Sequence, residues 1–254
     1  MEPKGRPGTR HWSKATHLNA EDAVARQGDI DVVFLGESIT EGWRGTSYGN
    51  PVGRKEGVPA IFKNIFTVEG GGKYEGLALG IASDTSPNLL YRLQNGELPA
   101  NLNPSVFWLL IGTNDLAITW CSAEYTLIGI LRVVEEIRIK KPGATVVINA
   151  LLPRTFHRHG YLAREQKKKL MDKSPPRPCL WDAIQAINEQ LKCYSENHEK
   201  VEFFETDVFY VDKFVREEDL RLDKTKMDDY LHPSVLGYEL WGKEIAEKLK
   251  TIIN

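Results

Sequence analysis

Cysteine is scarce in this sequence of 254 residues, which contains only Cys121, Cys179 and Cys193. No two of them form a C-x-x-C pair of the kind that binds metal, and their odd number argues against a disulfide framework. A single bridge stays open, but a reducing compartment is the simpler interpretation. A chain of this length can bury a sizeable hydrophobic core without covalent cross-links.

Long apolar runs and a strong charge of one sign are also missing. No apolar run approaches the roughly 20 residues that a membrane-spanning helix needs, and the N-terminus has no apolar segment of the signal-peptide type. The 33 Lys and Arg nearly balance the 35 Asp and Glu, so the formal net charge is -2 and no global field favours nucleic acid. We therefore expect a soluble, cytoplasmic protein with no nucleic-acid partner and no integral membrane segment. Secretion or import into an organelle stays open if the N-terminus has been trimmed.

Apolar runs of strand length alternate with longer amphipathic segments through most of the chain. Most runs show no polar alternation, as in parallel strands that are buried on both faces. The five runs are Asp31–Leu35, Gly76–Leu79, Ser105–Ile111, Thr145–Leu151 and Val201–Phe204. The helical patterns are Asn19–Gln27, Val58–Phe66, Asp84–Gln94, Ala123–Lys140, Leu180–Tyr194 and Val235–Ile253. This alternation predicts an α/β fold built on one doubly wound sheet of about five parallel strands.

The pattern suggests one domain, residues 29–254, preceded by an N-terminal tail and first helix in residues 1–28. Met1–Trp12 contains two prolines and two glycines and no apolar segment, so we expect it to be a loose tail or a remnant that is foreign to the natural chain. The segment 154–178 interrupts the pattern, because it has no periodicity and carries eight Lys and Arg against two acidic residues. A loop of this length in a compact domain is usually functional, although a solvated insertion without a role is an equal alternative. Residues 196–229 then carry twelve acidic residues against six basic ones.

A candidate nucleophile follows the first strand run. In open parallel sheets, ligands bind at the carboxyl ends of the strands, and the first run continues into Gly36-Glu37-Ser38. A serine in this place can stand at the sheet edge and at a helix N-terminus, where backbone N–H groups favour negative charge. Taken alone, Ser38 is more simply a helix N-cap, and Thr40 breaks the G-x-S-x-G elbow. Ser38 therefore needs a base and an acid as partners.

The best candidates for those partners lie near the other end of the chain, in Asp229-Tyr230-Leu231-His232-Pro233. Pro233 biases His232 toward an extended conformation. The segment can then turn so that the Asp229 carboxylate holds one imidazole nitrogen while the other nitrogen faces a serine hydroxyl. The alternative is a surface turn before a helix.

Two further strand ends offer groups that could stabilise an oxyanion. The third run leads to Asn114, whose side-chain amide is a neutral donor suited to charge that develops in a transition state. A helix cap or turn is an equally common role for such an asparagine. The second run leads to Gly80, where the missing side chain would allow a ligand to approach the backbone closely.

Taken together and in this order, these residues resemble the four sequence blocks of the SGNH (GDSL) hydrolase family. The resemblance runs from about Asp29 to Trp241. Within the family, the chain is similar to the catalytic subunits of platelet-activating-factor acetylhydrolase. The motifs that carry this likeness are Asp84-Thr85, the run from Leu90 to Leu98, and Leu151-Leu152-Pro153-Arg154.

The resemblance implies a three-layer α/β/α, flavodoxin-like fold and hydrolysis of carboxylic esters through an acyl-serine. It assigns the attack to Ser38, the proton transfer to His232 and the orientation of His232 to Asp229. The backbone N–H groups of Ser38 and Gly80, with the Asn114 side chain, would bind the oxyanion. No metal or organic cofactor is implied. We expect a small-molecule ester as substrate, and a homodimer as the assembly.

The substrate stays open at this point. Short-acyl or acetyl esters are the first expectation, with carbohydrate O-acetylesterase or lysophospholipase-like activity as alternatives. A catalytically silent subunit that serves as a binding partner or scaffold is the alternative from another class.

Three departures from the family pattern bear on the site. Glu37 stands where the family usually has aspartate, and we expect it to keep the local hydrogen bonds of the loop. Ala78 replaces a frequent asparagine, and Ala82-Ser83 replace a common glycine pair, which could reshape the oxyanion pocket. The insertion at 154–178 is longer than usual, and we expect it to be a lid or specificity loop near the mouth of the site.

Overall fold

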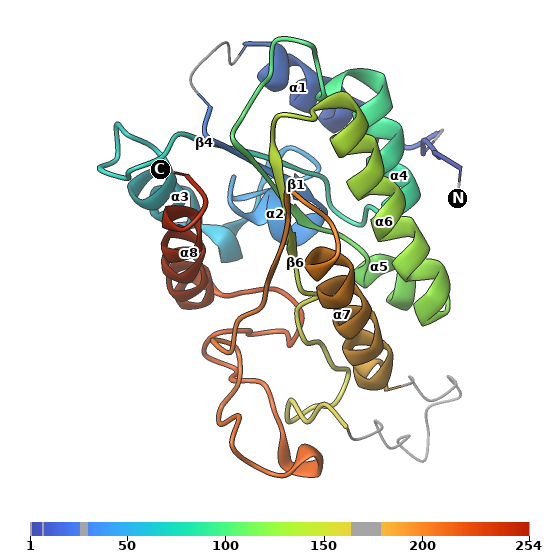
Figure 1. The fold of residues 1–254 in the computed structure, drawn as a ribbon. Coiled ribbons are helices and arrows are strands. Elements are labelled where there is room, and N and C mark those ends of the chain that lie inside the picture. The colour runs from blue at the N-terminus through green and yellow to red at the C-terminus, as the bar shows by residue number, and fades with distance from the viewer. Residues whose placement is uncertain (1, 7, 26–29, 164–178, 254) are drawn as a thin grey trace.

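The computed structural model describes residues 2–6, 8–25, 30–163 and 179–253 (Figure 1). Its elements in chain order are α1 (Arg10–Ala25), β1 (Val32–Gly36), α2 (Ser38–Gly42), β2 (Thr46–Ser47), β3 (Asn50–Pro51), η1 (Gly53–Lys55), α3 (Val58–Phe66), β4 (Gly76–Gly80), α4 (Ser86–Arg92), η2 (Leu93–Glu97), β5 (Val106–Leu110), α5 (Thr113–Ala117), α6 (Ala123–Lys140), β6 (Thr145–Asn149), α7 (Trp181–Glu196), β7 (Val201–Phe204), η3 (Glu217–Asp219) and α8 (Val235–Lys250).

The main sheet has five parallel strands in the order β4-β1-β5-β6-β7. When these five strands are numbered by their order along the chain, their order across the sheet is 2-1-3-4-5, which is the flavodoxin-like order. β1, β4 and β5 are buried along their whole length, as expected for strands covered on both faces. All five predicted strands are present, with ends shifted by no more than two residues, and the predicted α/β fold is confirmed.

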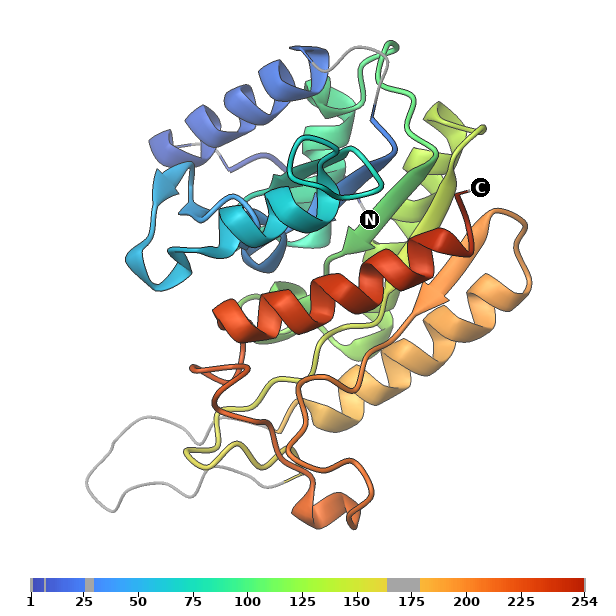
Figure 2. The same ribbon diagram turned by 90° about the vertical axis from the view of Figure 1, so that its left-hand side faces the viewer.

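Helices cover both faces of this sheet. α3 packs against α8 on one face, while α6 packs against α4 and α7 on the other (Figures 1 and 2). The connections that leave β1 and β5, which lead to α3 and α6, therefore lie on opposite faces. β1 and β5 are neighbours, so the strand order reverses between them. At such a switch point the loops diverge and leave a crevice outside the carboxyl ends of the strands.

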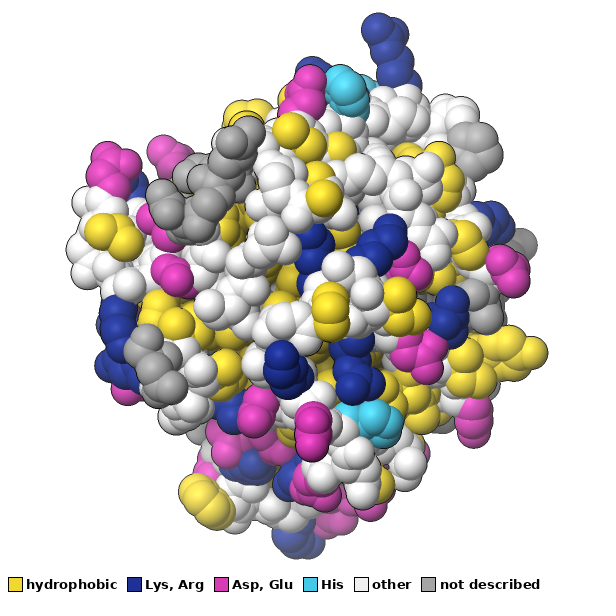
Figure 3. Space-filling view, turned by 45° about the horizontal axis from the view of Figure 1, so that its top comes forward, with side chains coloured by type: hydrophobic (Ala, Val, Ile, Leu, Met, Phe, Trp, Pro, Cys, Tyr) yellow, Lys and Arg dark blue, Asp and Glu magenta, His cyan; other side chains and the backbone are white. Residues whose placement is uncertain are grey.

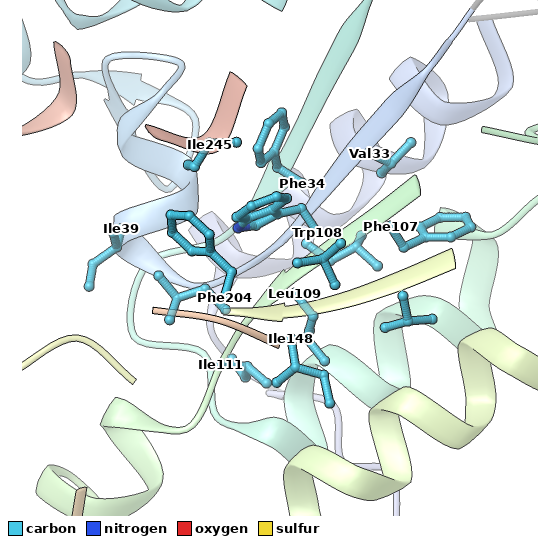
Figure 4. Packing of buried hydrophobic residues seen from close by; sticks show 14 of the residues in the cluster. Val33, Phe34, Ile39, Phe107, Trp108, Leu109, Ile111, Ile148, Phe204 and Ile245 are labelled. Carbon is cyan, nitrogen blue, oxygen red and sulfur yellow. The ribbon is translucent and has the colours of Figure 1, made fainter. Parts of the chain in front are cut away.

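A layer of aromatic side chains joins the sheet to α8 (Figure 4). The rings of Phe34 and Trp108 lie 6.2 Å apart, and Trp108 meets Phe204 edge-on at 4.8 Å. Trp43, just after α2, stacks on Trp241 of α8 with ring centroids 5.4 Å apart. Large buried rings of this kind dominate core energetics. They fix α8, and with it the segment just before α8, against the end of β1.

A buried arginine ties together the carboxyl ends of β1 and β4. Arg92 is fully buried, and its guanidinium donates to the carbonyl oxygens of Gly36 (2.8 Å) and Leu79 (3.3 Å). It also forms ion pairs with Asp84, at 2.7 Å, and with Glu97. Burial raises the pKa of Asp84 to about 6, and Arg92 offsets only part of that effect. One guanidinium thus faces two buried carboxyl groups.

The N-terminal segment is not the loose tail that we expected. α1 begins at Arg10 rather than Asn19, and the buried Trp12 donates from Nε1 to Asp84 Oδ1 at 2.6 Å. Arg6 donates to the Ala82 carbonyl oxygen at 3.0 Å. The prediction was wrong because the buried face of α1 consists largely of small and polar residues, which give no clear apolar stripe. The buried residues of α1 are Trp12, Ala15, Asn19 and Ala23.

The remaining differences from the prediction concern the ends of one helix, several short elements and the predicted lid. The predicted helix Asp84–Gln94 is α4, which begins at Ser86 after a capping box on Thr85 and continues as the irregular η2. The short elements α2, α5, η1 and the β2–β3 hairpin have too few residues to show a period. The predicted lid at 154–178 falls mostly on residues 164–178, which lie outside the described residues.

Lys and Arg side chains are interspersed with Asp and Glu on the face shown in Figure 3, as the near-neutral net charge leads one to expect. Among the described residues, no disulfide joins Cys121, Cys179 and Cys193. Across the described parts of the chain, every helix is too short or too polar to cross a membrane.

Replacing Arg92 by leucine should destabilise the fold strongly, because it leaves Asp84 and Glu97 buried without their cation. Breaking a buried ion pair in this way typically costs about 3–5 kcal/mol. We expect that loss in the free energy of unfolding, measured by urea denaturation at pH 7.

The matched control is Arg132→Leu, which removes a half-exposed pair with Glu135 and should cost less than about 1 kcal/mol. Equal effects of the two substitutions would show that Arg92 does not hold the strand ends.

Candidate active site

The residues singled out in the sequence come to the carboxyl edge of the sheet from separate elements. Ser38 begins α2 directly after β1, and Asn114 lies in α5 directly after β5. Asp229 and His232 lie in the loop that leads into α8. Ser38 and Asn114 therefore flank the switch point between β1 and β5, and the aromatic contacts of α8 bring the histidine loop to the same edge.

Ser38, His232 and Asp229 form one chain of hydrogen-bond contacts. Ser38 Oγ lies 2.9 Å from His232 Nε2, and His232 Nδ1 lies 2.8 Å from Asp229 Oδ2. Because an ionised carboxylate only accepts, Nδ1 carries a hydrogen. The other carboxylate oxygen of Asp229 accepts from the backbone N–H groups of Leu231 and His232, at 3.0 and 2.7 Å. The loop thus holds the carboxylate and the imidazole in one fixed relation.

Arg54 completes this group, although the sequence analysis did not single it out. Arg54 NH1 donates to Asp229 Oδ2 at 2.6 Å, and NH2 lies 3.2 Å from His232 Nδ1. Burial on its own would raise the pKa of Asp229, but hydrogen bonds from His232 and Arg54 outweigh it and hold that pKa well below its usual range. Asp229 therefore stays ionised. A single arginine in a short 3₁₀ turn gives no signal that sequence reasoning could have used.

Two buried side chains fix the first turn of α2. Lys55 Nζ donates to the carbonyl oxygen of Ser38 at 3.0 Å and to that of Thr46 at 3.2 Å. Burial lowers the pKa of Lys55. From the other side, the Tyr238 hydroxyl of α8 donates to the Ile39 carbonyl oxygen at 2.6 Å. The position of Ser38 is thus set from η1 and from α8.

A cavity of about 410 Å³ opens at this group. Ser38, His232 and Asn114 line it together with the basic side chains of Arg54 and Arg154. Arg154 belongs to the Leu-Leu-Pro-Arg motif and donates to the Thr113 hydroxyl at 3.0 Å. The predicted nucleophile, base and amide therefore share one cavity.

The wall of this cavity includes Tyr48, Ala82 and Ser83. The N-terminal segment braces it, because Arg6 donates to the Tyr48 hydroxyl at 3.2 Å as well as to Ala82. Ser83 has a positive φ of 61°, which is uncommon for a non-glycine residue. Its backbone N–H takes part in no hydrogen bond among the described residues, whereas the neighbouring Ala82 N–H donates to Glu41 at 2.7 Å.

Two of the three predicted oxyanion donors, Asn114 and Gly80, differ in their placement. Asn114 Nδ2 donates to the Asp84 carbonyl oxygen at 2.9 Å, which occupies one of its two amide hydrogens and leaves the other. Gly80 does not line the cavity. A Cβ at Gly80 would lie only 2.2 Å from the Glu41 backbone nitrogen. The missing side chain of Gly80 therefore makes room for the backbone of α2 and not for a ligand.

A larger cavity of about 560 Å³ lies elsewhere, between α7 and residues 205–220. Among the described residues, its lining contains no serine, cysteine or histidine, so it offers none of the usual pairs of nucleophile and base. The same described part of the chain has no group of three or more His, Cys, Asp or Glu that could hold a metal ion. The smaller cavity is therefore the candidate active site.

A flavodoxin-like sheet with a Ser–His–Asp contact chain at its carboxyl edge is the arrangement of a hydrolase of the esterase type. The chain belongs to the GDSL-like Lipase/Acylhydrolase family, whose sequence profile matches residues 34–240. This membership supports ester hydrolysis as the class of reaction and confirms the resemblance seen in the sequence.

The chain is similar to named proteins in sequence or in fold. Platelet-activating factor acetylhydrolase IB subunit alpha1 from Bos taurus is 26% identical over 231 residues, which are 91% of this chain and 79% of that protein. A GDSL-like lipase from Bacteroides thetaiotaomicron matches the fold with a TM-score of 0.62, at 23% identity over 94% of this chain and 99% of that one. A carbohydrate esterase family 3 protein from Talaromyces cellulolyticus matches with a TM-score of 0.54, at 17% identity over 88% and 98% of the two chains.

Replacing Arg54 by methionine should make the stability of the protein less dependent on Asp229. A lowered folded-state pKa contributes stability above the unfolded value of about 3.9, and that stability is lost as pH falls toward the folded value. The pair is partly exposed, so we expect Arg54→Met to cost about 1 kcal/mol or less at pH 7.

The cost should shrink at pH 3, as measured by urea denaturation at both pH values. Arg216→Met, which removes exposed contacts with Glu218 and Asp219, is the control and should show little change at either pH. A cost of Arg54→Met that grows on acidification would contradict this account.

Proposed function

We propose that the protein is a serine esterase that hydrolyses small or short-acyl carboxylic esters through an acyl-enzyme on Ser38. The observation that carries this proposal is the contact chain from Ser38 Oγ through His232 to Asp229, which lies at a cavity large enough for a small ester. A nucleophile within hydrogen-bond reach of a base that a third group orients is the general signature of nucleophilic catalysis.

In the first half of the reaction, Ser38 Oγ attacks the carbonyl carbon of the ester and its proton passes to His232 Nε2. The ionised Asp229 stabilises the imidazolium that forms, and does not itself take the proton. The carbonyl electron pair moves to the oxygen, which becomes an oxyanion. His232 then gives the proton to the departing alcohol, and the acyl group stays on Ser38.

The oxyanion needs donors that are already in place. We propose the second amide hydrogen of Asn114 and the backbone N–H groups of Ser38 and Ser83. Ser83 replaces Gly80 in this role because it lines the cavity and has its N–H available, while Gly80 lets α2 pack against β4. Loss of one such donor typically lowers kcat by about 10²–10³.

In the second half, water attacks the acyl carbonyl of the acyl-serine. His232 takes the proton of the water and returns a proton to Ser38 Oγ as the acid leaves. The same donors hold the second oxyanion. In both halves of the reaction, residues of this chain carry out every proton transfer.

The basic lining of the cavity bears on the alcohol moiety of the substrate. Arg54, Lys55 and Arg154 all line it, and no Asp or Glu does so among the described residues. This lining supports an ester with a polar alcohol moiety, as in a carbohydrate acetate or a phospholipid, over a plain hydrocarbon ester. The close contact of Ser38 with His232 argues against a silent scaffold subunit. The predicted homodimer stays a prediction.

A series of p-nitrophenyl esters from acetate to palmitate tests the proposal. We expect kcat/KM to be highest for acetate to butyrate and to fall with longer acyl chains, because the cavity is small. Ser38→Ala should lower kcat/KM by at least about 10³, as expected for loss of a nucleophile.

The control is Ser105→Ala, since Ser105 is exposed at the start of β5, at the opposite edge of the sheet, and should keep the wild-type rate. Turnover that survives Ser38→Ala would exclude Ser38 as the nucleophile, and a folded wild type without turnover would favour the silent subunit.

A further inference from the structure

The Ser38 hydroxyl has a second close partner besides His232. Glu37 Oε2 lies 2.7 Å from Ser38 Oγ, and the same oxygen accepts from the Ile39 backbone N–H at 3.1 Å. Glu37 therefore caps α2 and keeps the local hydrogen bonds of the loop. An aspartate, which the family usually has here, would end about 1.5 Å short of this position, one carbon–carbon bond less.

The number of hydrogens in this cluster limits which hydrogen bonds can form at the same time. Ser38 has a single hydroxyl hydrogen but contacts two groups that normally accept, Glu37 Oε2 and His232 Nε2. If Ser38 donates to Glu37, then Nε2 must donate to Ser38. Since Nδ1 already carries a hydrogen for Asp229, His232 is then an imidazolium. If Ser38 donates to His232 instead, Glu37 must be a protonated acid.

Both arrangements hold one proton more than an ionised Glu37 beside a neutral His232. They differ only in the positions of the hydrogens along Glu37–Ser38–His232. In the state with one proton fewer, the hydroxyl hydrogen can satisfy only one of the two acceptors. A state in which both short contacts are hydrogen bonds therefore holds the additional proton.

The surroundings of Glu37 leave one of its carboxyl oxygens without a partner among the described residues. Glu37 is fully buried, and its Oε1 has no hydrogen-bond partner among the described residues. A buried carboxylate with an unpaired oxygen is stabilised by a neighbouring cation or by protonation.

Other charged or titratable groups face the cluster from several elements, but their hydrogen bonds go elsewhere. Lys55 of η1, Asp115 of α5 and Tyr238 of α8 interact electrostatically with Glu37. Lys55 donates to the carbonyl oxygens of Ser38 and Thr46. Asp115 accepts from the Ser86 hydroxyl, and the Tyr238 hydroxyl donates to the Ile39 carbonyl oxygen. On the other side of the cluster, His232 faces Asp229 and Arg54.

We propose that Glu37 is a further catalytic residue, which binds the nucleophilic oxygen opposite His232 and keeps an additional proton on the Glu37–Ser38–His232 chain in the free enzyme. This inference rests on the proposed function. The chain must release that proton before Ser38 attacks. In the attack the Oγ–H bond then breaks, Nε2–H forms, Oγ bonds to the carbonyl carbon, and Glu37 stays ionised.

The test is the pH dependence of kcat/KM with p-nitrophenyl acetate. Glu37→Gln removes the charge that stabilises the extra proton but can still accept from the Ile39 N–H. We expect the midpoint of the acid limb to move to lower pH by about one unit, a differential interaction of about 1.4 kcal/mol. Glu37→Asp keeps the charge but withdraws it from Ser38, so it should move the midpoint less, in the same direction. Should Glu37→Gln fail to fold, the Glu37→Asp shift alone decides.

The matched control is Glu41→Gln. Glu41 is a second buried carboxylate of α2, bound to Thr46, Gly49 and Ala82 rather than to Ser38 or His232. This control should move the midpoint much less than Glu37→Gln does. A purely capping role for Glu37 predicts an unchanged midpoint with a lower plateau, and that result, or a shift to higher pH, would overturn the proposal.

An NMR titration of the His232 ring gives the same comparison without turnover. Wild type and Glu37→Gln should differ by the same downward shift whether or not the ester is hydrolysed. A shift in a protein that lacks esterase activity would contradict the proposed function and the catalytic role of Glu37, and would leave only the additional proton on the Glu37–Ser38–His232 chain standing. Esterase activity without a shift in either measurement would contradict the role of Glu37 alone.

Discussion

The buried guanidinium of Arg92 joins the parts of the molecule on which the site depends. It binds the carbonyl oxygens at the ends of β1 and β4 and pairs with Asp84 and Glu97. Asp84 in turn binds Trp12 of α1, and its carbonyl oxygen receives the Asn114 amide. Since the desolvation of these charges is offset only while all partners are present, the strand ends, α1 and Asn114 are held in one arrangement.

On this base, contacts from distant parts of the chain place each reacting group. Lys55 and Tyr238 fix the first turn of α2 from opposite sides, and the stacking of Trp43 on Trp241 sets α8 and the loop before it. Catalysis of acyl transfer needs groups that are positioned before the substrate arrives. In the proposed enzyme, the basic residues of the cavity face the substrate, and the buried Glu37 contacts Ser38 Oγ.

The strands and the residues of the Ser38–His232–Asp229 contact chain were open to prediction because their signals are local. A fully buried parallel strand is a continuous apolar run, and Ser38 and His232 stand in motifs with recognisable chemistry. α1 was misplaced because its buried face includes Asn19 and two alanines. The contact of Arg54 with Asp229 depends on the position of the turn η1, and the cavity wall at Ser83 depends on the positive φ of that residue. The placement of Gly80 follows from the packing of α2, which the sequence does not display.

The central claim is that Ser38 is a nucleophile activated by His232 in this cavity. Exposure of the folded protein to a fluorophosphonate probe, followed by mass spectrometry of its peptides, tests it most directly. The account predicts one covalent adduct, on Ser38, which forms at least about 10²-fold more slowly in His232→Ala because the general base is gone. No adduct on Ser38 in the folded wild type, or equal rates in the two proteins, would contradict it.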